Sequence, residues 1–599
     1  MNELRALIPY LKPYRSGILA GLALVVIANA FAVATPKLLG LAVDALERPD
    51  VTFSIILGHA TLIIGATILA GAARFGMRHL LNGISRRVEV DLRDAFFEHL
   101  LRLDLAFYRR TTTGDLMSRA TNDTQAVRMA AGPAIMYLVN TVAVTAFALF
   151  VMVRISPALT AVSLIPMALM PPIVLYFGRT IHRRFERIQA HFGDLSTLVQ
   201  ENLAGARIVR AYGQERAQEA EFDVLNAGYL DKNMALARVS GVFHPSLALL
   251  SGLGMVAVLW YGGTQVIQGR ISTGDFVAFG FYLAMLTWPM IALGWVINLF
   301  QRGAASMRRI NETMAIQPTV RPPERPVRMP SIRGEIEFRN VRFTYPGTKR
   351  PVLDDVSFRI EAGQTVALVG PTGAGKSTVV ALLTRLYDPD SGQVLVDGVP
   401  VDRIATEDLR AAMGVVPQDA FVFSETLADN LSFGLDGVDA AADRILEAAR
   451  IAQLEEVIEI LPHGLETRLG ERGVNLSGGQ RQRATLARAL ARDPAILVLD
   501  DALSAVDTHT ESRILTRLRA FMEGRTALVV SHRVTAVKDA DLILVLADGR
   551  IVEQGTYDEL IRKNGVFASL LRRQLAEQDL QAAGAPTAAA SNAISTASP

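Results

Sequence analysis

Six long stretches without any Asp, Glu, Lys or Arg lie in the first half of the chain and constrain its fold. They cover residues 18–36, 55–73, 129–153, 155–178, 239–269 and 276–301. Each has about 19 residues or more, enough for an α-helix to cross roughly 30 Å of hydrocarbon. Buried helices of a large soluble protein are the alternative, but six such runs in one half argue against it. We therefore predict transmembrane spans at about 16–44, 53–76, 129–153, 155–180, 239–268 and 274–302.

The composition agrees with a large membrane protein. The chain has 599 residues, of which 50% are hydrophobic and 20% charged, so it is too long for one domain and too apolar to be disordered. The formal net charge of +2 gives no indication of a nucleic-acid partner, and we predict none. The absence of cysteine excludes disulfides, thiolate catalysis and cysteine zinc sites.

The distribution of arginine predicts the orientation in the membrane. Residues 74–128 and 179–238 carry most of the basic residues of this half, whereas the other three connections carry very few. Basic residues concentrate on the cytoplasmic side, so we expect both termini and both long connections there, in a multi-pass protein of the plasma or inner membrane. The long connections are predicted to be helical at 86–103 and 183–200, with turn-like breaks at 111–115 and 202–206.

Polar residues inside the predicted spans allow two interpretations. The residues concerned are Asn29, Asn140, His244, Asn298 and Gln301. They could line a water-filled path or simply form hydrogen bonds between helices.

The second half has a different organisation. Residues 317–332 are rich in proline and are predicted to form a semi-rigid linker. Short β-rich runs at 365–369, 496–499, 527–530 and 542–546 then alternate with helical stretches, which is typical of an α/β domain with a largely parallel sheet. We predict this domain at 333–575, after a membrane domain at 1–316, and a disordered tail at 576–599.

A phosphate-binding motif follows the first of these strands. The sequence from Gly370 to Ser377 fits the P-loop pattern, in which small residues let backbone amides surround phosphates at a helix N-terminus. Lys376 is expected to reach the β- and γ-phosphates and Ser377 to bind Mg²⁺. The predicted ligands are ATP and Mg²⁺. The candidate nucleotide-binding residues here are Gly370, Pro371, Thr372, Gly373, Ala374, Gly375, Lys376, Ser377 and Thr378.

Two further motifs complete the candidate site. Asp500 ends the apolar run 495–500, as expected for the carboxylate that holds Mg²⁺ beside a P-loop. The sequence Leu-Ser-Gly-Gly-Gln opens a helical run at 481–492 and offers a second anion site through Ser477, Gly478, Gly479 and Gln480. One domain has no use for two phosphate sites on one nucleotide. Two domains facing head-to-tail would each supply these residues to the partner's ATP.

Together these motifs resemble those of the ATP-binding cassette (ABC) transporters, and of the exporter-type half-transporters in particular. The resemblance covers roughly residues 5–575. It implies a multi-domain fold, an all-α six-helix transmembrane domain followed by an α/β P-loop NTPase cassette. It also implies ATP hydrolysis coupled to transport, a second ABC half-transporter as partner, and work in a lipid bilayer.

The resemblance implies roles for further residues. Tyr345 in Phe-Thr-Tyr-Pro would stack on adenine. Gln418 in Val-Pro-Gln-Asp would reach Mg²⁺ and the attacking water, and His532 in Ser-His-Arg would contact the γ-phosphate. Asp501, which follows Asp500, stands at the position that polarises the attacking water. The predicted catalytic residues are Asp501, His532 and Gln418, and the predicted metal ligands are Ser377, Gln418 and Asp500.

Other matched segments concern communication between domains. Glu471 would contact the cytoplasmic projections, and residues 504–507 would cross to the other subunit. The tips at 113–119 and 205–212 match the two coupling helices of the family.

One residue departs from the family pattern. The family normally has Glu after the Mg²⁺-binding Asp, and this chain has Asp501. The shorter side chain moves the carboxylate by roughly 1 Å, an error that can cost about 100-fold in rate. The replacement resembles the weakened subunit of heterodimeric exporters, so we favour a heterodimer. A homodimer with two such sites remains open.

The leading hypothesis is ATP-driven export by alternating access. The uncharged spans contain aromatic residues, which suits amphipathic cargo such as drugs or lipids. An importer of metal chelates on the same scaffold and an ATP-gated regulator remain as alternatives.

Overall fold

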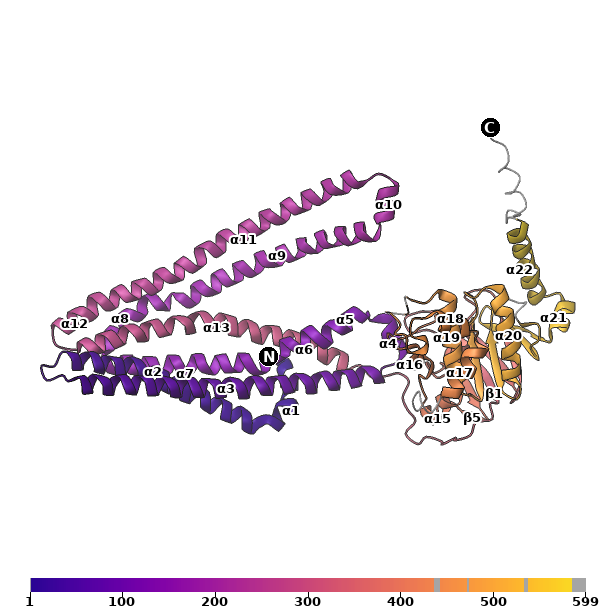
Figure 1. The fold of residues 1–599 in the computed structure, drawn as a ribbon, viewed down its shortest axis with the longest axis horizontal. Helices are drawn as coiled ribbons and strands as arrows, with labels where there is room; N and C mark the ends of the chain where they lie inside the picture. Colours follow the sequence, from indigo (N-terminus) through magenta and orange to yellow (C-terminus); the bar gives the residue numbers. More distant parts are fainter. Residues whose placement is uncertain (1, 436–441, 471–472, 474, 533–536, 584–599) are drawn as a thin grey trace. The chain divides into compact units, whose positions relative to one another are not determined.

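The computed structural model describes residues 2–435, 442–470, 473, 475–532 and 537–583 (Figure 1). Contacts divide the chain into two compact units. The first, the membrane unit, comprises Met1–Arg102 and Thr112–Gln317, and the second, the cassette unit, comprises Leu103–Thr111 and Pro318–Pro599. This division differs from the predicted boundary at 316, because a short segment from within the first half belongs to the cassette unit.

The membrane unit is entirely helical. Six helical stretches are long and apolar enough to cross a membrane, at Glu3–Leu46, Phe53–Arg102, Thr113–Ile155, Pro157–Ala204, Glu215–Ile267 and Thr273–Met314. Four of the six predicted spans lie wholly within one of them. The predicted span 155–180 begins two residues before its stretch, and the predicted span 239–268 ends one residue after its stretch. Their elements are η1 (Asn2–Leu7), α1 (Ile8–Leu11), η2 (Lys12–Tyr14), α2 (Arg15–Leu46), α3 (Phe53–Arg102), α5 (Thr113–Ser118), η3 (Arg119–Asp123), α6 (Thr124–Met129), η4 (Ala130–Ala134), α7 (Ile135–Ile155), α8 (Pro157–Ala168), α9 (Met170–Ala204), α10 (Ala206–Ala211), α11 (Glu215–Ala257), η5 (Val258–Gly262), α12 (Gly263–Ile267) and α13 (Thr273–Met314).

Within the membrane unit, α9 and α11 pack along each other and are joined through α10 (Figure 1). Helices α2, α3, α7 and α13 form the other group of packed helices. Between α2 and α7, the Asn29 side-chain amide donates a 3.0 Å hydrogen bond to Asn140 and a 2.8 Å bond to the Val25 carbonyl. For these two asparagines, the structure therefore favours hydrogen bonding between helices over a water-filled path.

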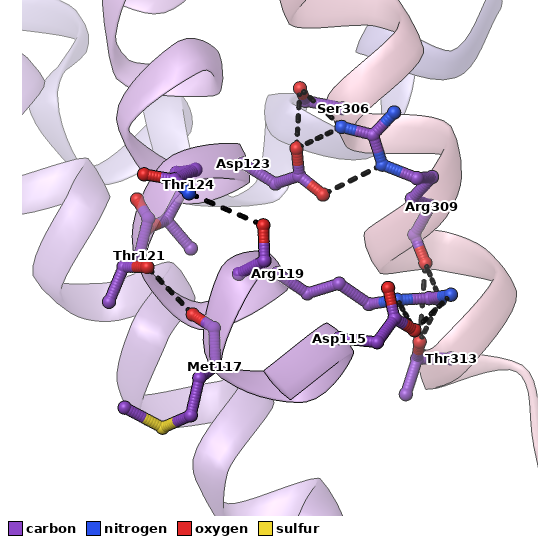
Figure 2. Close-up of polar contacts among 11 residues, drawn as sticks. Asp115, Met117, Arg119, Thr121, Asp123, Thr124, Ser306, Arg309 and Thr313 are labelled. Carbon is purple, nitrogen blue, oxygen red and sulfur yellow. Dashed lines mark hydrogen bonds and ion pairs between the residues drawn. The ribbon is translucent and has the colours of Figure 1, made fainter. Parts of the chain in front are cut away.

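A polar cluster ties the third helical stretch to α13 (Figure 2). Its members, here called the Asp123 cluster, are Asp115, Arg119, Asp123, Ser306, Arg309 and Thr313. Asp123 is buried and accepts hydrogen bonds from the Ser306 hydroxyl at 2.8 Å and from the Arg309 guanidinium through two nitrogens. Arg119 donates in turn to the Arg309 carbonyl at 2.9 Å and to the Thr313 hydroxyl at 2.7 Å, and forms an ion pair with Asp115. Asp123 and Arg119 thus bind successive turns at the end of α13.

In the part of the cassette unit that the structure describes, the strands form two sheets. One is four-stranded and antiparallel in the order β2-β1-β4-β5; the other has the order β10-β9-β3-β8-β7-β6, parallel except for the edge pair β10-β9. The strands are β1 (Ile336–Phe343), β2 (Leu353–Ile360), β3 (Thr365–Val369), β4 (Ser391–Val396), β5 (Val399–Pro400), β6 (Met413–Val416), β7 (Ile496–Asp500), β8 (Thr526–Val530), β9 (Leu542–Ala547) and β10 (Arg550–Gly555). The four strands expected from the sequence are β3, β7, β8 and β9, and all four are confirmed.

Helices pack on these sheets and, among the described residues, enclose three apolar clusters. They are α4 (Leu105–Arg110), α14 (Lys376–Leu383), α15 (Thr406–Ala411), α16 (Leu427–Leu431), α17 (Ala442–Ile451), α18 (Glu455–Ile460), η7 (Gly464–Glu466), α19 (Gly478–Ala491), α20 (Thr508–Met522), α21 (Tyr557–Lys563) and α22 (Val566–Ala583). The parallel strands are buried along nearly their whole length, which explains their continuous apolar sequences.

The beginning of the predicted disordered tail is helical instead. α22 continues to Ala583, so the prediction of disorder from 576 is wrong for 576–583. This stretch is rich in Ala, Gln, Glu and Leu, which favour helix and outweigh the lack of an apolar period. The rest of the predicted tail lies outside the described residues.

Candidate nucleotide-binding site

The P-loop joins β3 to α14 in the cassette unit. A Cβ on Gly370 would lie 2.0 Å from the Leu546 carbonyl oxygen, so only glycine allows this close approach to β9. Gly375 has a φ of 105° and forms the N-cap of α14, where a side chain would collide with Leu353. The first turn of α14 therefore points free backbone amides into the loop, the arrangement that binds phosphate.

Lys376 lies across the mouth of this loop. Its ammonium donates hydrogen bonds to the Gly370 carbonyl at 2.9 Å and to the Pro371 carbonyl at 3.0 Å. Burial lowers the pKa of Lys376, while the charges of Asp501 and Asp500 act in the opposite direction. The cation is thus held above the loop, where a nucleotide's terminal phosphates would lie.

Asp500 stands at the end of β7, directly beside the P-loop. Burial raises the pKa of Asp500, and the neighbouring charge of Asp501 adds to that effect. A hydrogen bond from Ser377 and the charge of Lys376 act in the opposite direction. The predicted metal ligands Ser377 and Asp500 are therefore brought into direct contact.

Asp501 follows β7 and contacts His532, which lies just after the end of the neighbouring strand β8. The two carboxylate oxygens of Asp501 lie 2.8 and 2.9 Å from His532 Nδ1. Asp501 has a φ of 52°, a conformation that places its side chain beside β8, and its amide donates to the Val530 carbonyl at 2.9 Å. The sequence suggested separate roles for these residues and did not indicate that they pair.

A cavity of about 370 Å³ brings together most of the predicted residues, although the lining that the described residues form does not include Gly370, Pro371 or Ala374. Its lining includes Tyr345, Thr372, Gly373, Gly375, Lys376, Ser377, Thr378, Gln418, Asp500, Asp501 and His532, together with Val352 and Val530. Ser377, Gln418 and Asp500 are among its lining residues, and carboxylate, hydroxyl and amide oxygens are the ligands that Mg²⁺ prefers. The cavity therefore fits a phosphate chain with its metal ion.

Tyr345 borders the same cavity and is fixed at both ends. Its hydroxyl lies 3.0 Å from the Thr378 hydroxyl on α14. Its ring packs edge-on against Phe343 and Tyr387, and the Arg109 guanidinium lies 4.8 Å from the ring centroid. The sequence did not indicate Arg109, because that arginine lies in the first half of the chain.

The second predicted anion site lies apart from this cavity. Ser477 is the N-cap of α19: its hydroxyl accepts from the Gln480 amide at 3.2 Å, and its own amide donates to the Gln480 side chain at 2.8 Å. Among the described residues, the lining of the cavity does not include Ser477, Gly478, Gly479 or Gln480. One chain alone does not bring its own two anion sites together.

Gln482 connects α19, the helix that Ser477 caps, to the loop at 504–507. Its side-chain amide donates to the Ser504 hydroxyl at 2.9 Å and its carbonyl accepts from the Ala505 amide at 2.8 Å. Gln482 is buried, so both bonds are shielded from water. This link between the two motifs was not evident from the sequence.

The segments matched to domain communication fall in different places. Thr113–Ser118 forms α5 in the membrane unit, whereas the preceding helix α4 belongs to the cassette unit. The tip at 205–212 contains α10, in the membrane unit. Glu471 lies outside the described residues.

Comparisons with known proteins agree with both units. The family model described as the ABC transporter transmembrane region matches residues 18–290, and the one described as ABC transporter matches residues 353–504. The chain is similar to the probable multidrug resistance ABC transporter ATP-binding/permease protein YheI of Bacillus subtilis, with 38% identity over 94% of this chain and 96% of that protein.

Two other relatives and one solved structure extend this result. The multidrug resistance-like ATP-binding protein MdlA of Escherichia coli is 37% identical over 94% of this chain and 95% of its own length. The ATP-dependent lipid A-core flippase of Syntrophus aciditrophicus is 34% identical over 86% of this chain and 85% of its own length.

The solved structure of a bacterial Atm1-family ABC exporter with ATP bound superposes with a TM-score of 0.74 and 29% identity, covering 94% of this chain and 98% of the other. Six apolar helices, a cassette with a P-loop cavity, and relatives of the same length thus agree. The chain is a multi-pass member of the ABC transporter family, an exporter-type half-transporter that couples ATP hydrolysis to transport as part of a dimer.

Proposed function

We propose that this chain exports amphipathic small molecules, drugs or lipids, by alternating access. One observation carries the proposal: a single chain contains both the cavity lined by Lys376, Ser377, Asp500 and Asp501 and six helices with uncharged, aromatic-containing spans. The relatives named for multidrug resistance and for lipid A-core flipping support such a cargo. Both termini would be cytoplasmic, in the plasma or inner membrane.

At the nucleotide, each residue has a defined task. Backbone amides of the P-loop and Lys376 would bind the phosphates, while Tyr345 would receive the adenine. Ser377, Gln418 and Asp500 would hold Mg²⁺, which neutralises charge on the phosphates. Asp501 would orient the attacking water, and His532, bonded to Asp501, would contact the terminal phosphate.

We further propose that the partner is a different ABC half-transporter. Asp501 is one methylene shorter than the usual glutamate, and in this structure its carboxylate is engaged by His532. Both features are expected to slow hydrolysis at the cavity of this chain. The complete Ser477–Gln480 turn would serve the partner's cavity, where a glutamate would carry most of the turnover. A homodimer with two slow sites is the second possibility.

Transport in inside-out vesicles tests the direction. Vesicles from cells that produce this chain and its partner should accumulate an amphipathic dye when ATP is added outside. Vesicles that carry Lys376→Ala in this chain and the equivalent substitution in its partner serve as the control. Uptake that occurs only in right-side-out cells would favour import instead.

The Asp501→Glu variant tests the weakened site. The measurement uses an assembly whose partner carries the substitution equivalent to Lys376→Ala, so that only the cavity of this chain hydrolyses ATP. If side-chain length limits hydrolysis, Asp501→Glu should raise the kcat of this assembly by about ten-fold or more. An unchanged kcat would mean that another step limits this site. Purification of the tagged chain with a second six-span chain would support the heterodimer, and a fully active homodimer would contradict it.

A further inference from the structure

Arg109 lies over the aromatic ring that the proposed function assigns to the adenine base. We propose that Arg109 is a positioning residue for the nucleotide: it holds Tyr345 in the orientation that receives the base, and thereby makes base binding and the docking of α4 depend on each other. The inference rests on the proposed function, because that function assigns Tyr345 to the base.

The first support is the firm attachment of α4 to the cassette unit. Asp104 caps this helix by accepting from the Phe107 amide at 3.3 Å, and it also accepts from the amide and the hydroxyl of Thr319. Burial opposes ionisation of Asp104, but the hydrogen bonds from Thr319, Phe107 and Val320 together outweigh it and lower the pKa of Asp104. Leu105 and Ala106 pack against the apolar core beneath β1 and β2. The position of Arg109 is therefore set by the cassette unit itself.

The second support is the geometry around the ring. The Arg109 guanidinium lies 4.8 Å from the Tyr345 centroid and 5.8 Å from the Tyr387 centroid. The two tyrosines are edge-to-face at 5.4 Å and 88°. A cation at this distance is attracted by the negative ring face, and a planar guanidinium also stacks on it.

The third support is that Tyr345 borders the cavity, so it joins α4 to the nucleotide site. Thr378 holds its hydroxyl end, and Arg109 holds the ring. A ring already fixed in one orientation loses less conformational entropy when a base stacks on it. Removal of Arg109 should therefore weaken the binding of the base and leave the binding of the phosphates unchanged.

The coupling free energy between nucleotide binding and the docking of α4 is the same for both processes. If the contact between Arg109 and Tyr345 strengthens nucleotide binding, nucleotide binding must strengthen the docking of α4 by the same factor. Because α4 follows α3 directly in the chain, occupancy of the base site would be communicated to the long membrane helix through one side chain.

The test compares a nucleotide with a ligand that has no base. We would measure the binding of AMP-PNP and of inorganic tripolyphosphate to the full-length assembly in lipid nanodiscs by calorimetry. Arg109→Ala should raise the Kd for AMP-PNP about two- to five-fold, the range expected for an exposed cation–π contact, and leave the Kd for tripolyphosphate unchanged. Arg109→Lys should recover part of the loss, and Arg403→Ala, at an exposed arginine elsewhere in the cassette unit, should have no effect.

A double-mutant cycle identifies the mediator. In a Tyr345→Ala background, Arg109→Ala should add no further loss of AMP-PNP affinity. Hydrogen exchange provides a second measurement: AMP-PNP should slow exchange in α4, and tripolyphosphate should not.

The outcomes distinguish failure of the role assigned to Arg109 from failure of the base site at Tyr345. Equal losses for both ligands, or tighter AMP-PNP binding in Arg109→Ala, would overturn the inference, because Arg109 would then act by general charge or by competing with the base. If Tyr345→Ala weakens AMP-PNP and Arg109→Ala does not, the inference fails while the proposed site stands. If neither variant weakens AMP-PNP, the assignment of the base to Tyr345 fails as well.

Discussion

Lys376 holds its charge over the P-loop through two loop carbonyls, at 2.9 and 3.0 Å. Phosphates would replace these carbonyls as partners of the cation. Lys376→Ala should therefore reduce ATP hydrolysis at the cavity of this chain by about 100-fold or more, since a charge that stabilises the transferring phosphoryl group is lost. ATPase assays would measure this in an assembly whose partner already carries the equivalent alanine substitution, so that only the cavity of this chain contributes. Lys349→Ala, at an exposed lysine of the same unit, is the control and should retain full activity.

Because the pKa of Asp500 is raised, we predict that this residue makes the stability of the folded cassette depend on pH. Burial raises its pKa, so the ionised carboxylate destabilises the folded cassette above that pKa when no Mg²⁺ balances it. Asp500→Asn removes this cost and should raise the Tm of the full-length protein in EDTA at pH 7.5. As the pH falls through the raised pKa towards the unfolded value of about 3.9, the wild-type carboxyl is protonated and the difference should vanish.

Thermal unfolding at a series of pH values, followed by circular dichroism, would measure this difference in Tm. Asp402→Asn, at an exposed carboxylate of the same unit, controls for the loss of charge. A gain in Tm that grows towards acid pH would contradict the assignment to Asp500.

Contiguous motifs in the sequence were sufficient to predict most of the residues that line the cavity. Val352 and Val530 were not predicted, and Gly370, Pro371 and Ala374 are not in the lining that the described residues form. Gly370 to Thr378 and Asp500 follow buried strands, and neighbouring parallel strands end at the same sheet edge. The contacts of Asp501 with His532 and of Arg109 with Tyr345 could not be predicted. Each joins segments far apart in the chain, and the turn that directs each side chain depends on packing that no local pattern records.

The Asp123 cluster joins two membrane helices and predicts a loss of stability when it is broken. Asp123→Ala removes a buried acceptor of the Ser306 hydroxyl and the Arg309 guanidinium. The unfolding free energy should fall by about 2 kcal/mol, as for other buried hydrogen-bonded groups left without a partner.

Thermal unfolding of the assembly in detergent would measure this loss. The matched control is Asp115→Ala, because Asp115 belongs to the same cluster but is more exposed and pairs with Arg119. Exchange of the charges, Asp123→Arg with Arg309→Asp, should recover part of the stability if the pair is responsible. Equal effects of the two single variants would argue that the cluster acts only through its net charge.

Long elements were predicted well and short ones poorly. Six membrane helices and four parallel strands are marked by continuous apolar runs, and their burial follows from those runs. α4 has only six residues, too few for an apolar period, and it is stabilised by the Asp104 cap and by the cassette core. The sequence therefore offered no reason to separate it from α5, the helix that follows.

The separation of the cavity from the Ser477–Gln480 turn predicts that activity is shared between subunits. An assembly with Lys376→Ala in one subunit and the equivalent of Gly478→Asp in the other should keep one complete site and part of its ATPase activity. If both substitutions are placed in the same subunit, the two sites each lose one component and activity should be lost. Equal activity in the two arrangements would contradict shared sites.

The insertion of Leu103–Thr111 into the cassette unit has a consequence for biogenesis. The ribosome synthesises this piece early, between two membrane helices, and the remainder of the unit only after the last membrane helix. The cassette can therefore reach its final packing only after the membrane half has been threaded into the bilayer. A fragment that starts at Pro318 would lack the cap from Asp104 and the side chains of Leu105 and Ala106, and would expose to water the apolar surface that they cover.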